Sequence, residues 1–351
     1  MENKMKEKLM LVSLDGVPAR EFQKVWKEES SCLVQELWTV YPSVTGPAHV
    51  SVLTGLTPME HGIMENMIIK KDNGEILSLY DPGKEEATMV MPEDNVVHWL
   101  VKERFRCISV NWPLGRGLPG ENYTEDMIRH EEISGVDIAW AKDRKALEIL
   151  KSQMKSNDWD FIDAHFEEYD SAAHMYGVNA ERTKEALSRM TKYVKELIDM
   201  AEIYGISNIL FFSDHGMFDK KESFFPAIYL KEHGYQKEII EERISFLADG
   251  SGCAQLFSTL TSEDTEHVIE CLKESGKIAD IKMIGNQEDI RREKDIFLRP
   301  VALLEMCPGV CAEDIIDASD ERYQEMKGLH GYNPEHVREM NGFFMSYDPD
   351  K

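Results

Sequence analysis

The sequence predicts an α/β protein with a doubly wound, mostly parallel sheet and a small α+β insertion. Two short apolar runs, 9–14 and 208–213, show no alternation with polar residues, which is typical of strands buried on both faces. Segments with helical spacing separate such runs, and strands that alternate with helices indicate a parallel sheet. Hydrophobic residues make up 42% of the 351 residues, so the chain can bury a large core.

The expected strands and helices alternate along the first part of the chain. Strands are expected at the short apolar runs, namely 9–14, 37–40, 105–110, 161–166 and 208–213. Helices are expected where apolar residues recur at helical spacing, namely 19–37, 94–103, 137–155 and 179–205. Residues 48–53 also have helical character, and 342–347 predict a last strand.

The pattern changes after residue 220. Residues 243–259 predict a β-hairpin around the turn sequence Asp-Gly-Ser-Gly. A helix is expected at 263–276 and a strand at 278–285. We therefore expect 1–220 and 321–351 to form the main domain, and 221–320 to form an α+β insertion that caps it.

The charge of the chain limits its partners. The formal net charge is −25, from 65 acidic and 40 basic residues. Such a balance disfavours binding to nucleic acids and to anionic membranes. The first residues contain no apolar run of signal-peptide length, and the six cysteines are expected to be reduced thiols. We therefore expect a cytoplasmic protein with a small-molecule substrate, while the pattern gives no indication of oligomeric state.

Polar side chains follow several of the expected strands at the point where each strand ends. They share the residue types Asp and His, and comprise Asp15, Asp170, His174, Asp214, His215 and, between two glycines before the last strand, His330. Ligands of open α/β sheets bind at the carboxyl ends of the strands. Each residue alone also fits a turn, a helix cap or a packed histidine. Their repeated coincidence with strand ends favours a shared site.

Asp and His are ligands that suit zinc, and manganese and iron accept the same set. Asp170 and His174 are four residues apart, which places both on one face of a helical turn. Three converging aspartates would repel one another without cations. Two divalent ions would bring four positive charges, of which the aspartates balance three. A deprotonated Thr45 would balance the fourth.

Thr45 lies in the segment Tyr-Pro-Ser-Val-Thr-Gly-Pro-Ala-His, directly before the helical run. Main-chain N–H groups at a helix start can hold a phosphate oxygen. A metal ion beside the hydroxyl would lower its pKa and make it a nucleophile at neutral pH. Gly46 and Ala48 are small, so a phosphoryl group has room to approach.

Five segments resemble the type I phosphodiesterase / nucleotide pyrophosphatase family of the alkaline phosphatase superfamily. They read SLDG, PSVTGPAHVSVLTGLTPMEHGI, YDSAAHMYG, FFSDHGM and GLHGY, within 8–217 and 326–347. The resemblance implies an alkaline-phosphatase-like core and a covalent phospho-threonine intermediate on Thr45. It also implies that Asn66 contacts a phosphoryl oxygen. One metal, usually zinc, would be bound by Asp170, His174 and His330, and the second by Asp15, Thr45, Asp214 and His215.

The chain departs from that family at two positions expected to bind substrate. Gly46 replaces an aromatic residue that stacks on the nucleotide base, and His165 replaces a second aromatic residue. The sequence thus predicts a two-metal phosphodiesterase or pyrophosphatase and leaves its preference for nucleotides open. The alternatives are a phosphonoacetate hydrolase, a phosphomonoesterase of the same superfamily, and a silent member that only binds a ligand.

Overall fold

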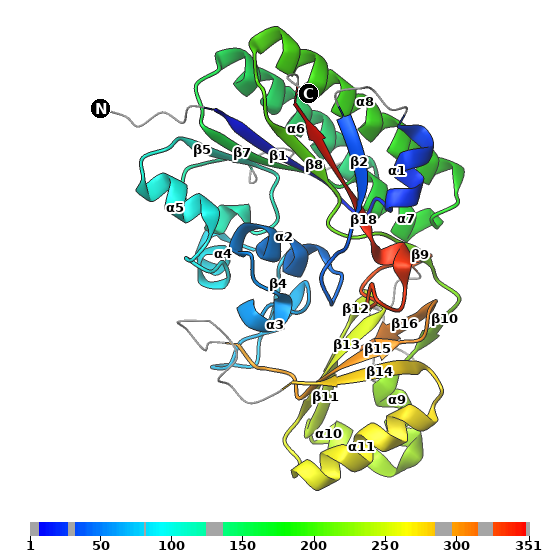
Figure 1. Cartoon of the computed structure of the whole chain (residues 1–351). Helices are drawn as coiled ribbons and strands as arrows, with labels where there is room; N and C mark the ends of the chain where they lie inside the picture. Colours follow the sequence, from blue (N-terminus) through cyan, green and yellow to red (C-terminus); the bar gives the residue numbers. More distant parts are fainter. Residues whose placement is uncertain are drawn as a thin grey trace.

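A computed structural model of the chain describes residues 7–26, 32–80, 82–123, 136–284, 297–314 and 326–348. Its centre is a seven-stranded sheet with the strand order β2-β18-β8-β1-β7-β5-β6 (Figure 1). The strands are β1 (Leu9–Leu14), β2 (Cys32–Leu37), β5 (Cys107–Val110), β6 (Glu121–Asn122), β7 (Phe161–Phe166), β8 (Ile209–Phe212) and β18 (Gly342–Tyr347). Strands β8, β1, β7, β5 and β6 are parallel, and β18 runs antiparallel to β8 and β2. This topology confirms the predicted α/β class with a mostly parallel sheet.

Helices cover both faces of the central sheet (Figure 1). One face packs against α1 (Ala19–Val25), α6 (Val136–Ser156), α7 (Glu168–Tyr176) and α8 (Glu181–Tyr204). The other face packs against α2 (Thr45–Thr54), α4 (Lys84–Val90) and α5 (Val96–Lys102). In β1, Met10 and Val12 belong to the first core and Leu9 and Leu11 pack against the second. Burial on both faces explains why these strands read as continuous apolar runs.

Most of the expected elements are confirmed within one to three residues at each end, as expected for boundaries placed from a sequence. The expected helix 19–37 and the expected strand 37–40 are wrong. Helix α1 ends at Val25, and Cys32–Leu37 is instead strand β2, which pairs with β18 from Cys32 opposite Tyr347 to Leu37 opposite Gly342. The partner strand lies at the far end of the chain, so local spacing could not reveal the pairing. Residues 27–31 lie outside the described part.

The segment after residue 220 builds a second lobe below the central sheet (Figure 1). Its largest sheet has the order β11-β13-β15-β14 and packs against the helical segment from α9 to α11. The elements are α9 (Pro226–Leu230), the π-helical turn Lys231–Tyr235, α10 (Gln236–Ile240), β11 (Ile244–Leu247), β13 (Cys253–Ser258), α11 (Ser262–Glu274), β14 (Ile278–Met283) and β15 (Ala302–Met306). The expected hairpin is present as the antiparallel pair β11 and β13.

Strand β12 (Asp249–Ser251) interrupts this hairpin and joins a three-stranded sheet with β16 (Val310–Glu313) and β10 (Glu222–Phe224). The remaining short elements are α3 (Pro58–His61), β3 (Met67–Ile69), β4 (Ile76–Ser78), β9 (Phe218–Asp219), β17 (Gly328–Leu329) and the 3₁₀ turns Gly115–Gly117 and Arg338–Met340. The division of the chain at 220 and 320 stays a prediction.

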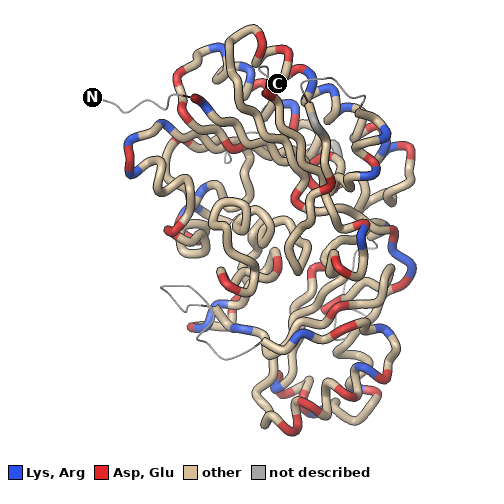
Figure 2. Tube along the Cα trace, viewed as in Figure 1, with Lys and Arg blue, Asp and Glu red and all other residues tan. Residues whose placement is uncertain are grey.

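Acidic residues are spread over both lobes (Figure 2), in line with the net charge of −25. Within the described ranges, no helix combines the length and the apolar character needed to cross a lipid bilayer.

Candidate active site

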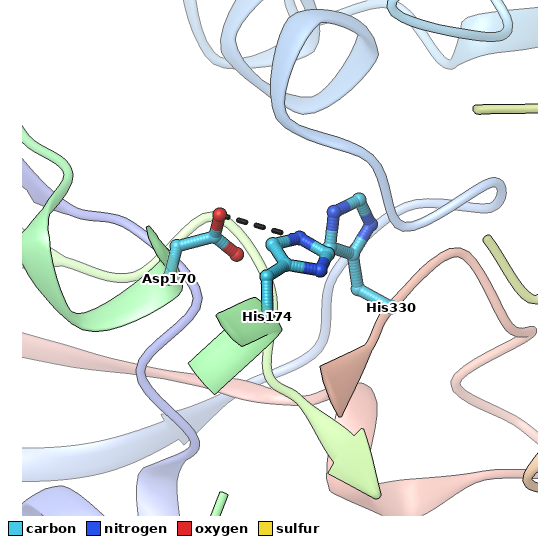
Figure 3. A group of neighbouring side chains, drawn as sticks. All are labelled: Asp170, His174 and His330. Atoms are coloured by element: carbon cyan, nitrogen blue, oxygen red, sulfur yellow. Dashed lines mark ion pairs between the residues drawn. The ribbon is translucent and has the colours of Figure 1, made fainter. Parts of the chain in front are cut away.

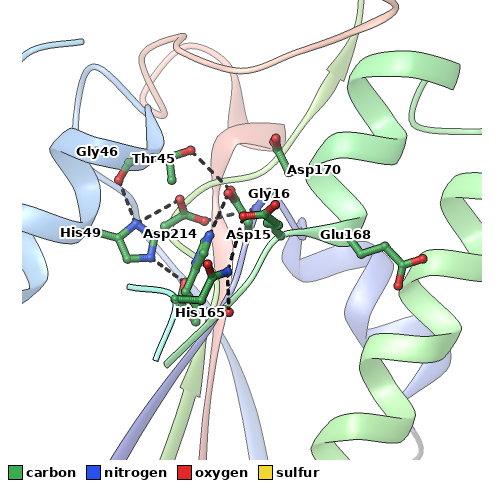
Figure 4. Close-up of polar contacts among 12 residues, drawn as sticks. Asp15, Gly16, Thr45, Gly46, His49, His165, Glu168, Asp170 and Asp214 are labelled. Carbon is green, nitrogen blue, oxygen red and sulfur yellow. Dashed lines mark hydrogen bonds and ion pairs between the residues drawn. The ribbon is translucent and has the colours of Figure 1, made fainter. Parts of the chain in front are cut away.

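Three elements bring their polar residues to the carboxyl edge of the central sheet (Figure 4). Asp15 follows β1, Thr45 begins α2, and Asp214 and His215 follow β8. The Thr45 hydroxyl Oγ1 lies 3.1 Å from His215 Nε2 and 3.5 Å from Asp15 Oδ1. Residues that are far apart in the sequence therefore surround the hydroxyl that was predicted as the nucleophile.

A second set of residues comes from α7 and from the loop after β17. Asp170 and His174 lie one turn apart on α7, with His174 Nε2 3.4 Å from Asp170 Oδ2, and His330 lies beside His174 (Figure 3). One ligand atom from each residue of this trio lies within 4.8 Å of the others. Asp143 fixes the start of α7, because its carboxylate accepts hydrogen bonds from the Glu167 and Glu168 N–H groups at 2.8 Å and 3.1 Å.

Asp170 also lies close to the first set. Ligand atoms of Asp15, Asp170 and His215 fall within 4.8 Å of one another, so one carboxylate reaches both candidate metal positions. Both carboxylate oxygens of Asp214 lie close to other groups of the protein. Its Oδ1 accepts the Gly16 N–H at 3.2 Å, while its Oδ2 lies 3.3 Å from His215 Nε2. The sequence placed Asp214 with the second metal group, and that ligand role stays a prediction.

The three histidines share one orientation. In each, Nδ1 faces a main-chain carbonyl: His174 faces Gly328 at 2.8 Å, His215 faces Gly216 at 3.1 Å, and His330 faces Ser43 at 3.2 Å. A carbonyl only accepts hydrogen bonds, so Nδ1 carries the proton and Nε2 keeps a lone pair. Metal-binding histidines are usually held in this way by a second partner.

These lone pairs point at other acceptors. His215 Nε2 lies 3.4 Å from Asp15 Oδ1, and Asp170 Oδ1 and Asp214 Oδ2 are buried without a hydrogen-bond partner among the described residues. Acceptors packed against acceptors need a proton or a cation between them. Two ions with Asp and His ligands satisfy this requirement, so the residues present fit the divalent metals that the sequence predicts.

The pKa values of Asp15, Asp170 and His330 also reflect the burial of these groups close to one another. Burial and the nearby carboxylates of Asp214 and Asp170 hold the pKa of Asp15 well above its usual range. Burial also raises the pKa of Asp170. Burial, with His215 and His174 nearby, holds the pKa of His330 well below its usual value. Each shift opposes the charge that the group would carry alone, and a bound cation would favour the deprotonated forms.

Gly16 allows the carboxylates to approach one another. Its φ is +68°, a conformation that side chains rarely adopt, and a Cβ atom there would lie 2.8 Å from Asp170 Oδ1. A glycine directly after Asp15 thus lets β1 turn sharply while α7 packs against it.

Gly46 and Asn66, both predicted to contact substrate, contact each other. The Gly46 N–H, at the start of α2, donates to Asn66 Oδ1 at 2.8 Å. The Asn66 side chain is buried, and its Nδ2 donates to the Tyr80 hydroxyl at 3.0 Å. One N–H of the amide is therefore used within the protein, and the second remains for another acceptor.

Two histidines have contacts that sequence reasoning missed. His165, predicted to bind substrate, is only 3% exposed, and its Nε2 lies 3.3 Å from Asp15 Oδ2. His49, given no role, is fully buried, with Nδ1 2.8 Å from the Thr45 carbonyl and 3.6 Å from Asp214 Oδ2. Burial lowers the pKa of both to about 3, so both are neutral at physiological pH. The four-residue spacing from Thr45 to His49 was the available signal.

Known proteins have similar sequences. The chain is 26% identical over 234 residues to bis(5'-adenosyl)-triphosphatase enpp4 of Xenopus laevis. It is 24% identical over 242 residues to ectonucleotide pyrophosphatase/phosphodiesterase family member 1 of Mus musculus. These matches cover 61% and 64% of this chain, and 48% and 25% of the two relatives. The chain thus spans about half, or less, of the length of these relatives.

A solved structure shares the fold. Murine ectonucleotide pyrophosphatase / phosphodiesterase 5, an inactive variant in complex with AMP, superimposes with a TM-score of 0.71 at 18% identity. The match covers 98% of this chain and 88% of that chain. Residues 9–332 also match the family model of type I phosphodiesterases / nucleotide pyrophosphatases, a range that contains every residue of the site described above. The chain belongs to the type I phosphodiesterase / nucleotide pyrophosphatase family.

Proposed function

We propose that the protein hydrolyses phosphate diesters through a covalent phospho-threonine intermediate on Thr45, with two divalent cations, zinc first among them. The observation that supports this most directly is the position of the Thr45 hydroxyl. It begins α2, lies 3.1 Å from His215 Nε2, and is flanked by the carboxylate of Asp15. The relatives named as a triphosphatase and as pyrophosphatases/phosphodiesterases support the same reaction class.

The residues that would hold the cations fall into two groups. Asp170, His174 and His330 would bind one ion, and Asp15, Asp214, His215 and the Thr45 oxygen would bind the other. When bound, the cations supply Lewis-acid stabilisation of the phosphoryl charge and lower the pKa of the Thr45 hydroxyl.

The chain's own residues then prepare the attack. Asp15 Oδ1 and His215 Nε2 lie 3.5 Å and 3.1 Å from Thr45 Oγ1 and would hold the cation, so the Thr45 hydroxyl would lose its proton to solvent. Thr45 Oγ1 bonds to phosphorus in line with the P–O bond that breaks, and the leaving oxygen takes a proton from water and departs as the alcohol. The phosphoryl group is then esterified to Thr45. The free N–H of the Asn66 amide donates to a phosphoryl oxygen. Water then attacks the phosphorus from the side of the departed alcohol and regenerates Thr45.

The residue at position 46 bears on whether the substrate is a nucleotide. The AMP complex of the murine protein and the adenosyl-triphosphatase relative favour a nucleotide substrate. In this chain, however, Gly46 has no side chain to stack on a base. A Cβ atom at position 46 would already lie 3.0 Å from Asn66 Oδ1, so the position has little room for one. We propose that any base selectivity comes from other residues.

The runner-up, a phosphonoacetate hydrolase, needs a cation for the substrate carboxylate. Two candidates for this cation have other partners. Lys70 Nζ lies 3.0 Å from Glu75, and the Arg116 guanidinium donates to the Pro82 carbonyl at 2.8 Å. Neither is positioned as a free carboxylate receptor, which favours the diester.

A hydrolysis panel tests the proposal. Zinc-loaded protein would be assayed on bis-p-nitrophenyl phosphate, a p-nitrophenyl nucleotide ester, p-nitrophenyl phosphate and phosphonoacetate, with the metal content measured in parallel. We expect two ions per chain and a clear preference for the diesters. Activity confined to the monoester or to phosphonoacetate would overturn the diesterase assignment. A higher rate on the nucleotide ester than on the plain diester would show that the base is recognised without an aromatic residue at position 46.

A further inference from the structure

A chain of hydrogen bonds links the start of α2 to the second lobe. The Gly46 N–H donates to Asn66 Oδ1 at 2.8 Å, Asn66 Nδ2 donates to the Tyr80 hydroxyl at 3.0 Å, and that hydroxyl donates to Asp249 Oδ2. Asp249 lies in β12, far from Asn66 in the sequence. This series of hydrogen bonds therefore begins beside the nucleophile and ends at a carboxylate of the second lobe.

In each of these hydrogen bonds, the chemistry of the groups fixes which one donates and which one accepts. A main-chain N–H can only donate, so the oxygen of the Asn66 amide faces Gly46 and its nitrogen faces Tyr80. A carboxylate accepts, so the single proton of the Tyr80 hydroxyl goes to Asp249 and its oxygen accepts from Asn66. Without the Tyr80 hydroxyl, the amide would be held through its oxygen alone.

The main chain holds both ends in place. Leu79 N–H donates to the Asn66 carbonyl at 2.7 Å, which continues the β3–β4 ladder and brings Tyr80 beside Asn66. Asp249 is fixed by β12, where it pairs with Glu313 of β16. Tyr80 is 64% exposed, so its ring does not need the contact for core packing. The position of its hydroxyl is better explained by the hydrogen bonds to Asn66 and Asp249.

We propose that Tyr80 and Asp249 are positioning residues that orient the Asn66 amide toward a phosphoryl oxygen. The inference rests on the proposed function of the site and extends it, because the lobe after residue 220 would then contribute to phosphoryl binding. Asn66 uses one N–H on Tyr80, and the geometry of a planar amide then fixes the direction of the other. A preorganised donor is worth more to a transition state than one that must rotate into place.

The test compares Tyr80→Phe, Asp249→Ala and Asp249→Asn with the wild type, alone and combined with Asn66→Ala. Assays would use whichever phosphate ester the hydrolysis panel shows to be turned over. We expect Tyr80→Phe and Asp249→Ala to lower kcat/KM about 10-fold, since one hydrogen bond is lost. Asp249→Asn keeps an acceptor oxygen and should stay close to wild type. In the Asn66→Ala background the same changes should have no further effect.

A matched control is Tyr123→Phe. The Tyr123 hydroxyl also donates to a carboxylate, that of Glu121 at 3.1 Å, and this pair lies away from the site. This substitution should leave kcat/KM unchanged. Binding of inorganic phosphate to the zinc-loaded variants, measured by calorimetry, gives a readout that needs no turnover. We expect Tyr80→Phe to weaken it about as much as Asn66→Ala does.

Two results would overturn the proposal: wild-type phosphate affinity and kcat/KM in Tyr80→Phe, or equal losses from Tyr80→Phe with and without Asn66. Equal losses would mean that Tyr80 acts on the substrate by another route. Neither result bears on Thr45. Failure of the proposed function would instead appear as a lack of diester hydrolysis by the wild type, while the phosphate measurement still decides the role of Tyr80.

Discussion

His49 Nδ1 lies 2.8 Å from the main-chain carbonyl of Thr45, the residue that carries the proposed nucleophile. The same nitrogen lies 3.6 Å from Asp214 Oδ2, and Nε2 lies 2.9 Å from the Ser13 hydroxyl (Figure 4). The Thr45 carbonyl can only accept, so Nδ1 carries the proton and Nε2 accepts from Ser13. One buried imidazole thus ties the first turn of α2 to β1 and to a candidate metal ligand.

This relationship predicts that two substitutions at position 49 behave differently. The side-chain nitrogen of His49→Asn can replace Nδ1 and keep the bond to Thr45, whereas His49→Gln reaches only the position of Nε2. We expect His49→Gln to lower kcat and zinc affinity about 10-fold to 100-fold, the usual effect of removing a partner of a metal ligand. His49→Asn should lose much less. The measurements are steady-state kinetics and chelator competition for zinc.

Ser13→Ala serves as the control for His49, because it removes only the partner of Nε2. It should retain most of the activity. If His49→Asn and His49→Gln lost activity equally, and in proportion to their melting temperatures, His49 would be a packing residue and the positioning role would be wrong.

Gly16→Ala is expected to disturb the metal site. The new Cβ would lie 2.8 Å from Asp170 Oδ1 in a backbone with φ of +68°, so the carboxylate must move. We expect fewer bound ions per chain, measured by elemental analysis after gel filtration. Gly74→Ala is the matched control, since its φ is +73° and its Cβ would have nothing within 4 Å. Full metal content in Gly16→Ala would show that Asp170 needs no such close approach.

The buried carboxyl of Asp163 predicts a pH dependence of stability. Burial in the middle of β7 raises its pKa to about 8. The folded state therefore binds this proton more tightly than the unfolded state. Its contribution to stability is complete below the ordinary Asp pKa and is lost as the pH rises through about 8. The free energy of unfolding should fall from pH 5 to pH 8.

Asp163→Asn removes this titration and should flatten that fall, which denaturant titrations at both pH values would measure. The exposed substitution Asp72→Asn should leave the wild-type slope unchanged. A slope in Asp163→Asn as steep as that of the wild type would contradict the assignment of a protonated carboxyl at position 163.

The α/β class could be predicted from the sequence, because strands buried on both faces, such as 9–14 and 208–213, are continuous apolar runs. It was not sufficient for β2. Cys32–Leu37 becomes a strand only by pairing with β18, and no local pattern encodes a partner more than three hundred residues away. The same limit hid β12, in which Asp249 and Ser251 pair with β16.

The site shows the same division. Asp15, Asp170, Asp214 and His215 could be predicted because strand ends of one sheet meet at one edge. The contacts of His49, His165 and Tyr80 could not, since they depend on side-chain packing between elements. Asn66 entered by resemblance, and the structure adds what holds its amide. The cytoplasmic location, the identity of the metal and the division into two domains stay predictions.

The most direct measurement compares Thr45→Ala and Thr45→Ser with the wild type in hydrolysis of bis-p-nitrophenyl phosphate, with metal content measured on the same samples. We expect Thr45→Ala to lose turnover at least about 1,000-fold, because the nucleophile is gone. Its metal content should stay near that of the wild type. Thr45→Ser keeps a hydroxyl and should retain a measurable fraction of the rate. Undiminished hydrolysis by metal-loaded Thr45→Ala would contradict the covalent mechanism.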